Sequence, residues 1–125
     1  MTSQRKLEMI AAGKEMDDQH AQKLRAIVTE LDPMGLRAMG APEGEYSHEI
    51  MMLAGSEYRI RSALTAARCL WEIFEYTFSG VHKHHPGYYA AAGRQVYQAF
   101  RDYDDALAKL IGMPTHELRR IAKRI

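Results

Sequence analysis

Proline and glycine cluster at a few points of this chain, and the stretches between them repeat apolar residues at steps of three and four. Such spacing places apolar side chains along one face of an α-helix, so it constrains the fold more than any other feature. The predicted helices are residues 3–31, 47–54, 56–78, 88–111 and 115–124. No stretch of useful length alternates apolar and polar residues, as a half-buried strand would.

The composition agrees with a helical protein. Methionine is common, with eight residues, whereas valine and isoleucine are sparse, and this balance favours helix over strand. A chain of 125 residues, 46% hydrophobic and 26% charged, is long enough to bury one core, which predicts a single domain over residues 1–125. We therefore expect an all-α fold, an irregular helix bundle of three long helices plus one or two short ones.

Hydropathy and charge limit the classes of partner. No run approaches the roughly 18 apolar residues of a membrane span, and the N-terminal residues lack the apolar core of a signal peptide. The formal net charge is +1, so no overall field indicates nucleic acid or membrane. We expect a cytoplasmic protein with no membrane partner.

The junction at residues 32–46 reads D-P-M-G-L-R-A-M-G-A-P-E-G-E-Y, with more glycine and proline than a simple helix connection needs. A residue before proline is pushed out of the helical region, so the first helix should end at Asp32-Pro33. We expect Gly35 or Gly40 to adopt a positive φ, because glycine tolerates it. The residues that define the junction are Asp32, Pro33, Gly35, Glu45 and Tyr46, and the last two should anchor it to the bundle.

This junction resembles a signature, D-P-x-G…A-P-x-[DE]-E-Y, of small bacterial all-helical proteins of unassigned function. Ser47 stands where members of that family usually have aspartate, which preserves a helix cap but loses a charge. The resemblance implies a helical fold and, together with the small size, an immunity-type or adaptor protein that works by binding another protein.

Three of the six histidines lie in one loop, V-H-K-H-H-P-G, at His82, His84 and His85. Imidazoles at such spacing can bind Zn²⁺ or Ni²⁺. The loop lacks the carboxylates or thiolates that normally complete a site, and the single Cys69 excludes a cysteine-based zinc site. We expect no cofactor and keep these histidines only as weak metal candidates; a pH-sensitive contact loop is the other alternative.

The sequence nominates no catalytic residues. It contains neither G-x-S-x-G nor a P-loop. Glu72 and Glu75 have no matching Glu-x-x-His pair on a second helix, so we interpret them as a solvated helix face. His20 lies on the apolar stripe of the first helix, where we expect a partly buried histidine with satisfied hydrogen bonds. An enzyme is therefore the less favoured class.

The C-terminal segment resembles a helix-turn-helix unit over about 20 residues. In that interpretation the side chains facing a DNA major groove would be Thr115, His116, Arg119, Arg120 and Lys123. Two observations oppose it. The apolar pattern from Val96 to Ile111 is unbroken, although such a unit needs a turn before its first helix, and three aspartates nearby, at 102, 104 and 105, would repel phosphates.

Three functions follow, in order of preference. The first is a non-enzymatic cytoplasmic protein of the immunity or adaptor type, with a protein partner. The second is a DNA-binding transcriptional regulator that acts through the C-terminal helices as a homodimer. The third is a metal-dependent enzyme built on the histidine loop.

Overall fold

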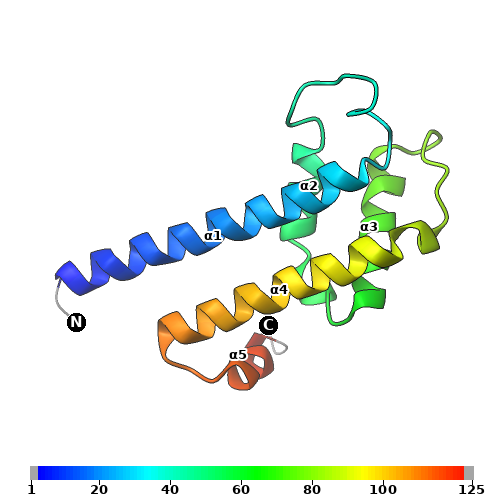
Figure 1. Ribbon diagram of the computed structural model, residues 1–125. Helices are drawn as coiled ribbons and strands as arrows, with labels where there is room; N and C mark the ends of the chain where they lie inside the picture. Colours follow the sequence, from blue (N-terminus) through cyan, green and yellow to red (C-terminus); the bar gives the residue numbers. More distant parts are fainter. Residues whose placement is uncertain (1–2, 123–125) are drawn as a thin grey trace.

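A computed structural model describes residues 3–122, which form five α-helices and two short 3-10 turns and contain no strand (Figure 1). The expected all-α helical bundle is therefore confirmed. The elements are α1 (Ser3–Leu31), α2 (Ser47–Ala54), η1 (Glu57–Arg59), α3 (Ala63–Thr77), η2 (Pro86–Tyr89), α4 (Ala90–Ile111) and α5 (Thr115–Ala122).

The two longest helices, α1 and α4, lie side by side and run in opposite directions, and α2 and α3 pack at one end of the pair (Figure 1). The closest approach joins α3 to α4 at Gly93. A Cβ atom on Gly93 would stand only 2.7 Å from the carbonyl oxygen of Ala63 and 2.8 Å from the Cβ of Ala67. Glycine is required there because any side chain would push the two helices apart.

The core lies where α1, α2, α3 and α4 meet. Its largest fully buried side chains are Tyr89, Phe74, Leu24, Leu53, Leu70, Val28 and Val96. The buried residues of α1 are only Leu24 and Val28, both in its second half. The first half of α1 therefore extends along α4 beyond the main core, as Figure 1 shows.

The predicted ends of α1 and α2 are confirmed, whereas the predicted start of the third helix was wrong. We expected a helix from residue 56, but residues 57–59 form a 3-10 turn and α3 begins at Ala63. Ser62 and Thr65 set this start with a capping box, in which the Ser62 side chain accepts from the Thr65 N–H at 3.1 Å. Ile60 is buried, but its backbone is extended and it precedes the cap, so it is not part of the helix.

Gly112 ends α4 in the left-handed conformation, with φ 74°, as expected for a helix cap. The chain then turns through Pro114 into α5, which packs against α4. The predicted end of this last helix near residue 124 lies outside the described residues. None of the helices in residues 3–122 has the length and apolar character needed to cross a membrane.

Candidate functional site

Asp32 organises the signature loop, residues 32–46, from the end of α1. Its φ is 47°, a value that is uncommon for a residue with a side chain. Its carboxylate accepts hydrogen bonds from the backbone N–H groups of Arg37 and Ala38, both at 3.0 Å. It also accepts a bond of 2.6 Å from the Tyr46 hydroxyl, so that one side chain closes the loop onto itself.

Tyr46 anchors the other end of the loop to the bundle. It is 4% exposed, and its ring meets the Phe74 ring edge-on, with centroids 5.6 Å apart. The hydroxyl oxygen also accepts from the N–H groups of Met34 at 3.1 Å and Leu36 at 3.5 Å. Glu45, in contrast, is exposed, so the anchoring expected of the Glu45-Tyr46 pair comes from the tyrosine.

Electrostatics fixes the direction of the bond between Asp32 and Tyr46. Burial acts to raise the pKa of Asp32, but the hydrogen bonds from Tyr46 and from two backbone amides outweigh it, and the pKa is lowered. Burial, followed by the bond to Asp32, raises the pKa of Tyr46 to about 12. At neutral pH the hydroxyl therefore donates to an ionised carboxylate, which is the stronger class of hydrogen bond.

The glycines of the loop are needed for its backbone. Gly35, Gly40 and Gly44 have φ values of 68°, 83° and 95°. This confirms the expectation that Gly35 or Gly40 has a positive φ. No heavy atom lies within 4 Å of a Cβ built on either of those two residues, so the backbone conformation and not crowding demands glycine there.

A groove of about 730 Å³ separates the signature loop from α1. One wall is a face of α1 at helical spacing, and the other is the loop around Pro42 and Gly44. The lining residues are Gln22, Arg25, Ala26, Thr29 and Glu30 of α1 with Arg37, Ala41, Pro42, Glu43, Gly44, Glu45 and Tyr46 of the loop. Most of them are exposed, so the groove is open to solvent along the surface.

Charged side chains of both signs line both walls of the groove. Arg25 of α1 donates to the Ser47 hydroxyl at 3.4 Å. Arg37 of the loop and Glu30 of α1 form an exposed ion pair at 3.3 Å. Glu43 and Glu45 on the loop wall are both exposed. Each wall therefore offers both charges, Arg25 and Glu30 on the helix and Arg37, Glu43 and Glu45 on the loop, which suits a polar segment that also carries both charges.

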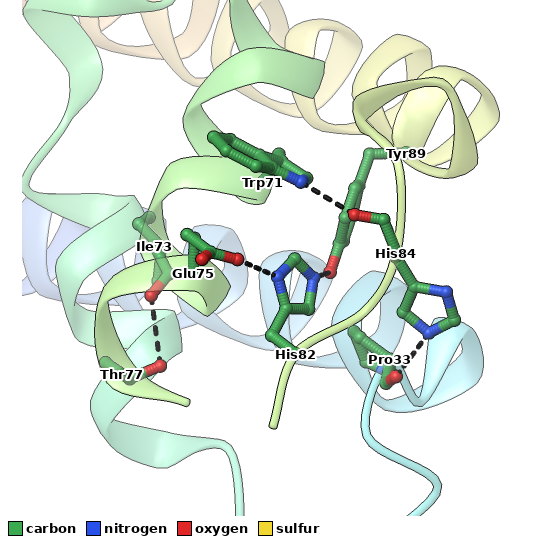
Figure 2. A network of polar contacts seen from close by, with 8 residues as sticks. All are labelled: Pro33, Trp71, Ile73, Glu75, Thr77, His82, His84 and Tyr89. Carbon is green, nitrogen blue, oxygen red and sulfur yellow. Dashed lines mark hydrogen bonds and ion pairs between the residues drawn. The ribbon is translucent and has the colours of Figure 1, made fainter. Parts of the chain in front are cut away.

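Beside the signature loop, the histidine loop, residues 81–87, is held by side chains from neighbouring elements (Figure 2). The buried His82 ring has Nδ1 2.8 Å from the Glu75 carboxylate and Nε2 2.7 Å from the Tyr89 hydroxyl. Because a carboxylate only accepts, Nδ1 carries the hydrogen of the bond to Glu75, and Nε2 shares the second hydrogen bond with the Tyr89 hydroxyl. Such a chain suits acid–base chemistry only if its last group reaches a substrate. Tyr89 is 0% exposed, so the chain connects α3 to η2 and its Tyr89 end does not reach the surface.

The histidine loop also completes the end of α1. The His84 Nε2–H donates to the carbonyl of Pro33 at 2.6 Å, and the Trp71 indole donates to the His84 carbonyl at 2.8 Å (Figure 2). The Tyr88 ring stacks on His84 with centroids 3.7 Å apart, and its hydroxyl donates to the carbonyl of Leu31 at 3.1 Å. The last carbonyls of a helix have no partner within it, so the Tyr88 hydroxyl satisfies that of Leu31, while His84 fixes Pro33 just beyond the helix end.

The three histidines that were weak metal candidates do not converge. His82 is bonded through both ring nitrogens, His84 donates to Pro33, and His85 Nδ1 accepts from the Gly87 N–H at 3.0 Å. Within residues 3–122, no group of three or more histidine, cysteine, aspartate or glutamate side chains could hold a metal ion.

The residues of the DNA-binding interpretation lie on α5 and differ in their surroundings. Arg119 reaches back to α4, with Nε 3.3 Å from Asp104 and Nη2 3.8 Å from Asp105. His116 and Arg120 are exposed and Thr115 is partly exposed, whereas Lys123 lies outside the described residues. The helix before the turn is the 22-residue α4, which is unbroken from Ala90.

Sequence reasoning missed several of these contacts. Glu72 and Glu75 were interpreted as a solvated face, yet Glu72 pairs with Arg59 and Glu75 with His82. The helix wall of the groove was also missed, because an exposed polar stripe carries no signal of the loop that stands opposite. His20 was expected to have satisfied hydrogen bonds, and this was wrong: neither of its ring nitrogens has a hydrogen-bond partner in the part of the chain that the structure describes.

No known protein family, curated protein or solved structure matches this chain.

Proposed function

We propose that this chain is a non-enzymatic protein that binds another protein through the groove between the signature loop and α1. The observation that carries the proposal is that the most unusual segment of the sequence, residues 32–46, forms one wall of a groove of about 730 Å³. Asp32 and Tyr46 hold that wall in one conformation before any partner arrives. A preformed wall lowers the ordering cost of association.

The shape and chemistry of the groove favour a protein segment over an enclosed small molecule. Its volume lies in the range of binding pockets, but its exposed lining makes it an open surface. Arg25 on one wall and Glu43 and Glu45 on the other offer charged groups to a partner's side chains. Together with the resemblance of the signature, this supports an immunity-type or adaptor role in the cytoplasm of a bacterium.

The test needs a pair of variants that differ only in location. Ala26 lines the groove and Ala91 lies on α4, and both are exposed helical alanines. For crosslinking, a photo-reactive amino acid replaces Thr29, which also lines the groove, or Ala91. Each protein is expressed in cells of its source organism, and the proteins crosslinked to it are identified. The purified partner is then titrated with the wild type, Ala26→Trp and Ala91→Trp.

We expect one protein to crosslink from position 29 and not from position 91. Ala26→Trp should fill the groove and weaken the purified complex at least tenfold, about 1.4 kcal/mol, whereas Ala91→Trp should not. If no protein crosslinks from position 29, or if both tryptophan variants bind equally well, the groove is not the binding site.

DNA binding is the second candidate, favoured by the exposed His116 and Arg120 on a helix that follows a sharp turn at Gly112. Arg119 is held by two aspartates and is less free to read a base. If the candidate holds, a selection from random duplexes at about 150 mM salt should return a palindromic site that Arg120→Ala abolishes. We expect only weak, salt-dependent association with any duplex.

A further inference from the structure

His20 occupies the contact between α1 and α4, outside the groove. Its ring meets Phe100 edge-on and lies against Tyr103, with both centroid distances 4.6 Å. Both ring nitrogens are buried, and neither makes a hydrogen bond to any group within residues 3–122. A polar ring in this position is tolerated while it is neutral, but a charged ring would lose its hydration without gaining a partner.

The space beside the ring is too small for a side chain to move in and compensate. A cavity of about 40 Å³ adjoins His20 between Met16 and Lys23 of α1 and Ala99 and Ala106 of α4. That volume is enough for a water molecule and for little else.

The carboxylates that face His20 are each engaged with another group. On α1, Asp17 accepts from the Tyr103 hydroxyl at 2.6 Å. On α4, Asp102 pairs with Lys23 at 3.6 Å. Asp104 is held by Arg119 of α5 at 3.3 Å and shares a side-chain hydrogen bond with Glu57 of η1. A proton on His20 would therefore have to compete for charges that already stabilise other contacts.

The balance of these groups disfavours the charged ring. Burial, followed by the positive charge of Lys23, lowers the pKa of His20 from its usual 6.5, and the opposing effects of Asp104 and Asp17 are smaller. The folded protein consequently binds this proton less readily than the unfolded chain does.

The first half of α1 is the part that such a charge would release. It has no fully buried side chain before Leu24. A Cβ on Gly13 would stand 4.0 Å from the Leu110 side chain, which is an ordinary van der Waals contact with room to spare. Segments with few buried apolar contacts open at low free-energy cost.

We propose that His20 is a pH-sensitive latch, and that protonation of its imidazole loosens the first half of α1 from α4. At neutral pH the uncharged ring packs between the two aromatic rings and the helices stay together. In the open state the first half of α1, which we call the arm, is detached from α4. Below pH 6.5 the open state takes up the proton more readily than the closed state, so the arm opens more often while the core around Leu24 stays packed.

The sign of the effect follows from linkage. Because the pKa of His20 is lowered in the folded state, protonation favours the open state. The stability of the contact between the first half of α1 and α4 therefore decreases as the pH falls below 6.5. At pH 5.5 the largest possible effect of one such proton is about a tenfold change in the opening equilibrium, because the gap to 6.5 is one pH unit. Glu57 has a pKa raised to about 7 by burial and by Asp104 and acts with the opposite sign, so variants must be compared at each pH.

The experiment is hydrogen exchange followed by mass spectrometry at pH 7.5 and 5.5, with intrinsic rates corrected at each pH. Between pH 7.5 and pH 5.5 we expect the wild type to lose protection in the peptide covering residues 5–19. This loss should exceed the loss in His20→Phe several-fold, and by at most about tenfold. His20→Phe keeps an aromatic ring in the contact and removes the titrating nitrogens. The exposed His48→Phe should respond to pH as the wild type does.

His20→Gln is measured as well, in case the phenylalanine disturbs the packing, since it is also unable to titrate. The proposal fails if both His20 variants lose protection at pH 5.5 as much as the wild type does. It also fails if the wild type shows no change in this peptide.

Discussion

The hydrogen bond from Tyr46 to Asp32 should make a measurable contribution to stability, and Tyr46→Phe isolates it. The substitution keeps the ring against Phe74 and removes only the hydroxyl. That hydroxyl donates to the Asp32 carboxylate at 2.6 Å and accepts from two backbone N–H groups. A hydrogen bond to a charged group contributes about 1.5–3 kcal/mol. We therefore expect a loss of about 2 kcal/mol in the free energy of unfolding, or roughly 6–10 °C in Tm for a chain of this size.

The loss should depend on pH in a defined direction. The pKa of Asp32 is lowered in the folded state from its usual 3.8. Its stabilising effect is therefore complete above pH 3.8 and disappears as the pH falls through the folded-state value. Because Tyr46 is one of the donors that lower this pKa, the difference between wild type and Tyr46→Phe should be largest at pH 7 and should shrink below pH 3.8.

Urea unfolding followed by the fluorescence of Trp71, the only tryptophan, measures both effects. Tyr76→Phe is the matched control, because Tyr76 is 75% exposed and its hydroxyl faces water. An unchanged urea midpoint for Tyr46→Phe at pH 7 would refute the reasoning. So would a loss that stays the same size in acid, because the bond would then not depend on the ionised carboxylate.

Three further outcomes follow from packing. Gly93→Ala should lower the free energy of unfolding by about 1–3 kcal/mol, because the added Cβ would overlap α3. Gly55→Ala, whose Cβ would make only ordinary contacts, should be nearly neutral, and thermal melts of the two variants test the difference. His82→Leu should cost about 1–3 kcal/mol in urea unfolding because the buried Tyr89 hydroxyl loses its partner, and adding Tyr89→Phe should recover part of that loss. The thiol of Cys69 is 0% exposed and burial raises its pKa, so iodoacetamide should label it only at the rate at which the protein unfolds.

The helices that the sequence predicted best are those whose ends are set by local chemistry. Pro33 ends α1 and Gly112 ends α4, and each acts on its own few neighbours. The start of α3 was missed because Ile60 continues the apolar pattern although it is buried in an extended conformation. Periodicity reports which side chains are buried and does not report the backbone conformation that buries them.

The candidate site was predictable only in part, for the same reason. Asp32 and Tyr46 were found because their residue types and spacing describe a turn. The groove depends on how far the loop stands from Thr29 and its neighbours on α1, a distance that no local pattern encodes. The missing hydrogen bonds of His20 likewise follow from what α4 places opposite it, more than 75 residues away in the chain.

The way the histidine loop completes the end of α1 has a consequence for synthesis of the protein. The bond between Asp32 and Tyr46 joins residues 14 apart and can form soon after both have been made. The donors to Pro33 and Leu31 come from His84 and Tyr88, which lie 51 and 57 residues later. Closing so long a segment costs entropy before any hydrogen bond forms, so we expect these contacts to form after the bond between Asp32 and Tyr46. A nascent chain that stops before the histidine loop would carry the signature without its outer support, and on the proposed function it would not yet be competent to hold a partner.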